Sequence, residues 1–192
     1  DYGVHIAYYD ATNGQLKYAL RKNNAWTIRV IDQPSTTAAS AELELESAEP
    51  WEQTERPWRD PDLLGSQAIE ATTAGGVGMY TSIAVDSDDY PHISYYDSDN
   101  RDLKYARWDG VTWDIESVDT NDNVGKYSSL ALDGDDDPHI AYYHDTLDAL
   151  RYANKTSGDW DIDTVDGASD EDRVYPGPYG SLAASDSGRA YI

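Results

Sequence analysis

The chain has 192 residues, which is enough for one domain with its own hydrophobic core. Its formal net charge of −23 argues against nucleic acid as a partner and against anionic lipid, because such a surface repels phosphate groups. The sequence has no Cys, which excludes disulfides and Cys-ligated zinc, and it has no apolar run of about 18 residues that would predict membrane insertion.

Residues 1–32 contain the first copy of an internal repeat. A His-Ile-Ala-Tyr-Tyr segment, His5 to Tyr9, is followed by Leu-Lys-Tyr-Ala, Leu16 to Ala19, and then by Trp26. Short segments rich in aromatic and β-branched residues, separated by Asp, Asn and Gly, are typical of β-hairpins. We therefore expect residues 1–32 to supply the last three strands of a four-stranded unit.

Residues 33–76 interrupt the repeat. They contain neither of the two motifs, they carry four Pro and a run of Glu, and they separate His5 from His92 by 87 residues. We expect an acidic insertion or arm here, with a short strand at 42–46; by length, the segment could also be a further repeat unit. Loops this long in compact domains are usually functional or disordered.

Residues 77–120 and 121–168 contain two complete copies, 47 residues apart from His92 to His139. Each begins with an additional element, Tyr80 to Asp86 or Tyr127 to Asp133. The Tyr of this element precedes the Ile of the His-Ile motif by 13 residues in both copies, so the register of that hairpin is specified. Each copy is predicted to form four short antiparallel strands.

Residues 169–192 are predicted to be a linker followed by the first strand or strands of a further unit, since Tyr179 to Ser185 repeats the additional element. Arrays of four-stranded units with this period are typical of β-propellers. The predicted fold is all-β, a β-propeller of four-stranded antiparallel blades with about three blades in this chain. Since propellers usually close with about four to eight blades, we expect a partial propeller or one completed by another subunit.

The combined pattern resembles the β-propeller repeats of many secreted bacterial and archaeal proteins, which are similar to the sialidase and Asp-box propeller group. The turn from Asp109 to Trp113 resembles a shortened Asp-box. The resemblance implies an extracellular or cell-surface location. The Arg-Ile-Pro type of motif found in that group is missing from this chain, and we expect a non-catalytic protein.

The recurrent His residues of the repeat are predicted to have a structural role. His5, His92 and His139 belong to three different units, and the fourth copy has Tyr191 at the same position. His144 is off the pattern and is predicted to lie in a turn. Trp26, Trp113 and Trp160 occupy one repeat position and are predicted to pack between blades.

Four less regular aromatic residues are the candidates for ligand binding through exposed stacking surfaces. Trp108 stands at a position where the other copies have no aromatic residue, and it is the strongest of the four. The others are Trp51, Trp58 and Tyr175.

Two acidic loops are the candidates for metal binding. Oxygen-bearing side chains stand at alternate positions there, an arrangement suited to hard cations such as Ca²⁺. The candidate ligands are Asp133, Asp135, Asp137, Asp119, Asn121 and Asn123. Asp and Asn are also preferred turn residues, so turn formation is the alternative explanation.

Two functions remain open from the sequence. The first is a non-catalytic module for self-assembly or for cell-envelope and protein interaction, acting through open strand edges and the insertion arm. The second is a lectin-like propeller that binds carbohydrate between blades. A remnant glycosidase is a distant third.

Overall fold

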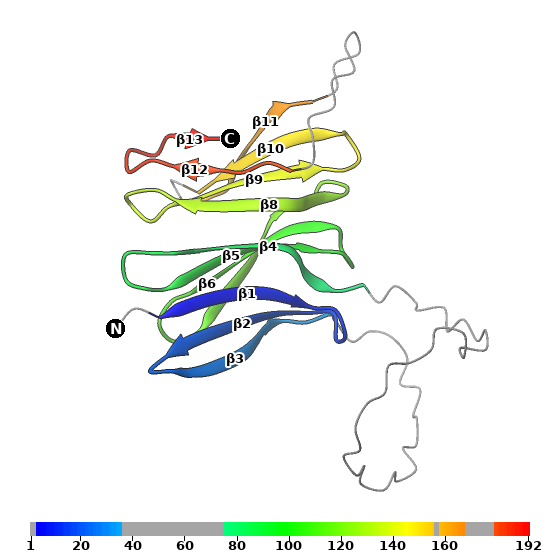
Figure 1. Ribbon diagram of the computed structural model, residues 1–192. Helices are drawn as coiled ribbons and strands as arrows, with labels where there is room; N and C mark the ends of the chain where they lie inside the picture. The colour runs from blue at the N-terminus through cyan, green and yellow to red at the C-terminus, as the bar shows by residue number, and fades with distance from the viewer. Residues whose placement is uncertain (1–2, 36–74, 156–157, 168–178) are drawn as a thin grey trace, which may run out of the picture. The chain divides into compact units, whose positions relative to one another are not determined.

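The computed structural model describes residues 3–35, 75–155, 158–167 and 179–192, whose strands form four antiparallel sheets (Figure 1). All four sheets lie in one compact unit that comprises residues 1–34 and 75–192. The predicted all-β class is confirmed for the described residues. No helix in this part of the chain is long and apolar enough to cross a bilayer.

Two of the sheets have four strands each. Sheet B contains β4 (Val77–Val85), β5 (Pro91–Asp97), β6 (Asp102–Trp108) and β7 (Trp113–Asp119), and sheet C contains β8 (Val124–Leu132), β9 (Pro138–His144), β10 (Ala149–Asn154) and β11 (Asp161–Asp166). In both, strands that are consecutive in sequence are neighbours in the sheet.

The other two sheets are shorter. Sheet A contains β1 (Val4–Asp10), β2 (Gln15–Lys22) and β3 (Ala25–Asp32), and sheet D contains β12 (Ala183–Ala184) and β13 (Ala190–Tyr191). By the repeat, β4, β8 and β12 are first-position strands, and β1, β5, β9 and β13 are second-position strands. Sheet A therefore has the second to fourth positions, and its first position is empty among the described residues.

The repeated spacing produces a repeated register. Ile83 pairs with Ile93 in sheet B, and Leu130 pairs with Ile140 in sheet C. Both first-position strands have register shifts near a Tyr with positive φ: Tyr80 has φ 53° and Tyr127 has φ 56°. Non-glycine residues rarely adopt this conformation, and here it belongs to an irregularity that both repeats share.

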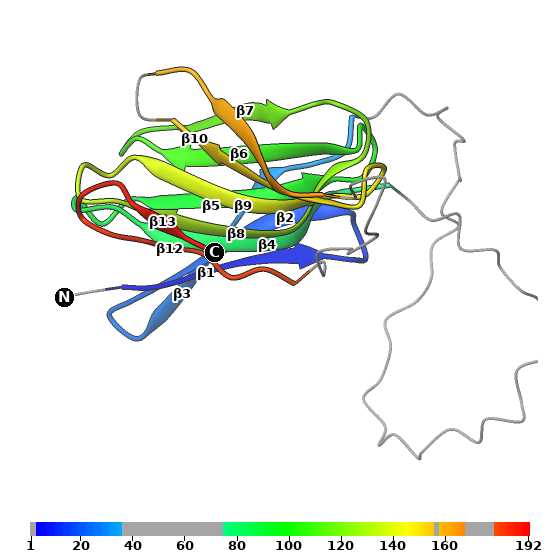
Figure 2. The same ribbon diagram turned by 90° about the horizontal axis from the view of Figure 1, so that it is seen from above.

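The hydrophobic cores lie between consecutive sheets. One is formed by residues of sheets A and B, including Leu16 and Ile93, and the next by residues of sheets B and C, including Leu103 and Ile140. All four side chains are fully buried. Sheets A, B and C thus follow one another in space as they do in sequence (Figure 1), and their strands overlap when the molecule is seen from above (Figure 2).

Candidate functional site

The repeated His residue is held inside its own sheet in the complete copies. His92 shares a hydrogen bond with the Tyr105 hydroxyl through Nδ1, and its Nε2 lies 3.2 Å from Asp86 Oδ2. His139 makes the same two contacts in sheet C. Burial lowers the pKa of His92 and outweighs the opposing effect of its hydrogen bond to Asp86. These contacts agree with the predicted structural role.

His5 differs from its two counterparts. Its Nδ1 pairs with the Tyr18 hydroxyl at 2.8 Å, but its Nε2 is buried without a hydrogen-bond partner among the described residues. The nearest carboxylate, Asp89 of sheet B, lies 3.6 Å away. The reason is that the Asp that meets His92 follows a first-position strand, and sheet A has none among the described residues.

The repeated Trp packs on the preceding sheet, as predicted. The Trp113 ring lies edge-on to Tyr18 with centroids 5.4 Å apart, and Trp160 lies edge-on to Tyr105 at 5.2 Å. Trp26, on the side of sheet A that no described sheet covers, is 49% exposed. Packing between consecutive sheets is therefore confirmed for two of the three residues.

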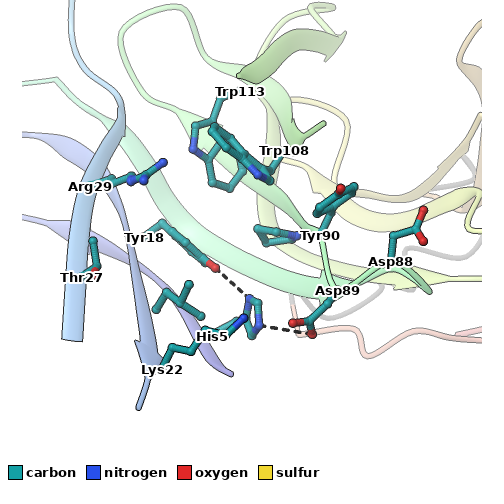
Figure 3. A pocket seen from close by; sticks show the side chains of 12 residues that line it. His5, Tyr18, Lys22, Thr27, Arg29, Asp88, Asp89, Tyr90, Trp108 and Trp113 are labelled. Carbon is teal, nitrogen blue, oxygen red and sulfur yellow. Dashed lines mark hydrogen bonds and ion pairs between the residues drawn. The ribbon is translucent and has the colours of Figure 1, made fainter. Parts of the chain in front are cut away.

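A cavity of about 360 Å³ lies between sheets A and B. Sheet A contributes residues of β1, β2 and β3, including His5, Tyr18 and Arg29, and sheet B contributes the turn before β5 together with Trp108 and Trp113 (Figure 3). We call this cavity the A/B cleft. Its aromatic residues are buried or half-buried, whereas its charged side chains Lys22, Arg29, Asp88 and Asp89 are exposed.

Trp108 gives the A/B cleft its particular chemistry. In sheets A and C the corresponding residue is a cation that lies over the repeated Trp: Arg21 over Trp26 at 6.0 Å and Lys155 over Trp160 at 5.6 Å. In sheet B, Trp108 packs on Trp113 with centroids 5.7 Å apart. The cation on Trp108 comes from the other wall of the cleft, since the Arg29 guanidinium lies 5.4 Å from the ring centroid.

An equivalent cavity of about 250 Å³ lies between sheets B and C, and its lining is different. Glu116 and Lys155 occupy the positions of Arg29 and Trp108, and the Lys155 ammonium donates to both Glu116 oxygens at 2.6 and 2.7 Å. No Trp lines this B/C cleft among the described residues. The two equivalent positions therefore hold an ion pair in the B/C cleft, whereas in the A/B cleft they hold an indole ring and a guanidinium.

One of the four predicted ligand-binding residues, Trp108, lies in the A/B cleft, and it is half-buried where the sequence predicted an exposed side chain. Trp51, Trp58 and Tyr175 lie outside the described residues. Sequence reasoning missed Arg29 and Tyr90 as lining residues. A position-by-position comparison of the copies could have indicated Arg29, because the other copies have Glu116 and Asp163 at that position.

The acidic loops use their oxygens in turns and between sheets. Asp133 Oδ1 accepts the backbone N–H of both Asp135 and Asp137. Asp119 Oδ1 accepts from Asn121, and Asn123 Oδ1 accepts the hydroxyl of Tyr96. Across the described ranges, no group of three or more His, Asp or Glu is placed to hold a metal ion. Calcium binding by these loops stays a prediction.

The turn prediction for His144 was wrong. This residue ends strand β9 and is 1% exposed. Its Nδ1 accepts the backbone N–H of Leu147 at 3.3 Å, so the imidazole takes the turn-closing role that the Asp97 carboxylate has in sheet B. Burial lowers the pKa of His144, and the nearby charge of Arg151 adds to this effect.

No protein-family model matches the chain, and no curated protein matches it. Among solved structures, the chain is similar to a fucose lectin from Kordia zhangzhouensis in complex with methyl-fucoside. The two share 16% sequence identity and a TM-score of 0.43, over 84% of this chain and 90% of the lectin chain.

Proposed function

We propose that this chain is a non-catalytic module of the β-propeller type and that it binds a glycan in the A/B cleft. The propeller assignment is supported by the repeated four-stranded sheets, by their shared register, and by cores that join each sheet to the next. The extracellular location inferred from the sequence resemblance belongs to the same proposal.

The observation that carries the binding proposal is the lining of the A/B cleft. Tyr90, and Trp108 beside the Arg29 guanidinium, offer aromatic surfaces against which the apolar face of a pyranose ring can pack. Lys22 and Arg29 can donate hydrogen bonds to ring hydroxyls, and Asp88 and Asp89 can accept them.

The charge balance of the lining favours a neutral ligand. Two cationic and two carboxylate side chains stand at the A/B cleft, so neither an anion nor a cation is preferred by net charge. The B/C cleft has Arg107 and Lys155 but four carboxylates, and the Lys155–Glu116 ion pair takes the place that Trp108 and Arg29 have in the A/B cleft. Glycan binding is therefore assigned to the A/B cleft.

The test is a double variant that gives the A/B cleft the residues of its neighbour, Arg29→Glu with Trp108→Lys. Both replacements already occur at the equivalent positions in a folded unit, so the variant should fold with an unchanged circular dichroism spectrum. Binding of a panel of neutral methyl glycosides is measured by titration calorimetry. We expect the wild type to bind at least one of them, and the double variant to bind it at least about tenfold more weakly, a loss of 1.4 kcal/mol.

The matched control carries out the same exchange in the other cleft, Glu116→Arg with Lys155→Trp. This variant should leave the wild-type affinity in place. The proposal is wrong if the wild type binds no glycoside of the panel, or if both double variants bind as the wild type does.

A further inference from the structure

The outer edge of sheet A, strand β1, has no neighbouring strand among the described residues. Ile93 and Ile140 of the complete sheets are fully buried, but Ile6 at the same position is 42% exposed and Val4 is 50% exposed. β5 and β9 pair on this side with the first-position strands β4 and β8, whereas β1 has no such partner among the described residues. An exposed apolar edge of this kind is a template for strand addition.

Two buried polar atoms without partners point to the same empty position. They are His5 Nε2, whose nearest carboxylate is Asp89 at 3.6 Å, and Thr81 Oγ1, two of the five such side-chain atoms among the described residues. In the complete sheets, the His at this position meets the Asp that follows a first-position strand, as His92 meets Asp86 at 3.2 Å.

The second atom, Thr81 Oγ1, has a counterpart in Ser128. The Ser128 hydroxyl donates to the backbone oxygen of Tyr80, in the first-position strand of the preceding sheet, at 2.8 Å. A first-position strand beside β1 would thus provide a backbone acceptor for Thr81 Oγ1, as Tyr80 does for Ser128, and would bring the residue that follows the strand to His5 Nε2.

The chain carries an additional first-position strand. Residues 179–185 repeat the sequence of this element, and Leu182 N–H donates to Ser129 Oγ at 3.0 Å just as Leu130 N–H donates to Ser82 Oγ. Their only partner within sheet D is β13, through Ala183 and Ala184. Tyr179 packs on Tyr127 with centroids 4.8 Å apart, and it is 82% exposed.

We infer that residues 179–185 of a second copy of this chain pair with β1 and displace β13 of that copy. The register follows from the complete sheets, where Ile83 faces Ile93 and Val85 faces Pro91. Leu182 of the second copy then lies opposite Ile6, and Ala184 of the second copy lies opposite Val4.

The same strand cannot reach β1 within one chain. β12 packs against β8 of sheet C, and sheet B lies between sheet C and sheet A (Figure 1). The contact is therefore between chains and head to tail, with a different surface on each copy.

Further contacts become available on the same side of sheet A. The Tyr95 hydroxyl donates to Asp32 of the preceding sheet at 2.7 Å, and Tyr142 donates to Asp119 in the same way at 2.7 Å. The equivalent residues Tyr8 of sheet A and Asp166 of sheet C make no such hydrogen bond among the described residues, and Asp166 is exposed. In the inferred contact, Tyr8 meets Asp166 of the second copy.

The repeated Trp gives a parallel case. Trp113 packs on Tyr18 and Trp160 packs on Tyr105, each on the sheet before it. Trp26, 49% exposed, then packs on Tyr152 of the second copy.

Cross-linking tests the register directly, because the wild-type chain has no Cys. One chain carries Val4→Cys and a second, longer tagged chain carries Ala184→Cys. Facing residues of antiparallel strands have Cα atoms about 4.5–5.5 Å apart, within the range of a disulfide. After mixing and oxidation with copper phenanthroline, the expected product on a non-reducing gel is the mixed dimer.

The control pair replaces Ala184→Cys by Ser187→Cys, an exposed position that does not face β1 in the inferred register. Preferential mixed dimer with Ala184→Cys supports the inference. Equal cross-linking of both pairs, or none, overturns it, as does a wild-type mass of one chain in light scattering at high concentration. A single-chain mass would mean that β1 pairs with a segment of its own chain and not with a second molecule.

A second variant tests the His5 contact. Ser185 stands where the other first-position strands are followed by Asp86 and Asp133, so Ser185→Asp restores the carboxylate that would face His5. We expect the dimer to tighten by about tenfold, the effect of one charge-assisted hydrogen bond. Ser187→Asp adds the same charge two residues away and should not tighten it; equal effects of both would contradict the inferred pairing. Glycan binding by the A/B cleft does not depend on this result.

Discussion

At the scale of single residues, Asp119 connects sheet B to sheet C. It ends β7 of sheet B, and its fully buried carboxylate accepts the Tyr142 hydroxyl at 2.7 Å and the Arg151 guanidinium at 2.9 Å, both from sheet C. Burial alone would raise the pKa of Asp119, but the hydrogen bonds from Tyr142, Asn121 and Arg151 together lower it. The charged form of Asp119 is therefore stabilised by folding.

We expect Asp119→Ala to lower the free energy of unfolding by about 3 kcal/mol at pH 7, because it leaves Arg151 and Tyr142 without their buried acceptor. A group with a lowered folded-state pKa stabilises the protein above its unfolded-state pKa of about 3.9, and this stabilisation is lost as the pH falls through the folded-state value. The difference between wild type and variant should therefore shrink below about pH 4.

Urea unfolding followed by circular dichroism measures both effects. The control is Asp161→Ala, at an exposed position of β11, which should change stability by less than about 0.5 kcal/mol. A loss no larger than that of the control would show that the carboxylate is replaceable by water.

The structural role of the repeated His was predictable from the sequence, because the fourth copy has Tyr191 at the same position. The partners of Asp119 were not. The Asp-rich loop around it suggested a metal site, and nothing in the local sequence shows that Tyr142, 23 residues further on, supplies the hydroxyl.

At the scale of elements, two glycines set how closely each first-position strand approaches the sheet before it. Gly78 and Gly125 have positive φ, and a Cβ at either position would lie 2.7 Å from the Cα of Leu16 or Leu103. Both Leu residues are fully buried members of the cores between sheets. The backbone of one sheet thus packs directly on a strand of the preceding sheet, which only Gly permits.

We predict that Gly125→Ala is strongly destabilising, by about 3 kcal/mol or more, because the new methyl group clashes with backbone atoms of Leu103 in addition to the strain of a positive φ. Gly158→Ala is the matched control. Gly158 has φ 99° against 98° for Gly125, but, chain neighbours aside, no atom of the described residues lies within 4 Å of its Cβ position. Only the strain of about 1–2 kcal/mol should remain there.

Chemical denaturation of the two variants separates these contributions. Equal losses for Gly125→Ala and Gly158→Ala would mean that the two sheets can move apart at little cost, contrary to the close packing described above.

The strands themselves could be predicted from the sequence, and each of the four strands predicted for residues 77–120 overlaps an observed strand. The reason is local: alternation of side chains and Asp or Asn turns are encoded within a few residues. The A/B cleft could not be predicted in the same way, because Arg29 and Trp108 face each other across two sheets and are 79 residues apart.

At the scale of the whole molecule, the net charge of −23 opposes compaction. The described ion pairs place Lys17, Lys104, Arg151 and Lys155 on carboxylates, so these cations offset only part of the acidic excess. The charge was evident from the sequence, whereas its pairing across sheets required the structure. Buried pairs such as Arg151–Asp119 are screened weakly by salt, and the repulsion among exposed carboxylates is screened strongly.

Salt should therefore stabilise the folded chain. Raising NaCl from 10 to 150 mM shortens the Debye length from about 30 to about 8 Å, which removes most of the repulsion between exposed carboxylates and leaves the buried pairs intact. We expect the melting temperature to rise by about 3 °C, equivalent to roughly 1 kcal/mol for a chain of this size. Differential scanning calorimetry at constant pH and protein concentration measures it, with sucrose at equal osmolality as the uncharged control. A melting temperature that falls with salt would mean that exposed ion pairs stabilise the fold more than the acidic excess destabilises it.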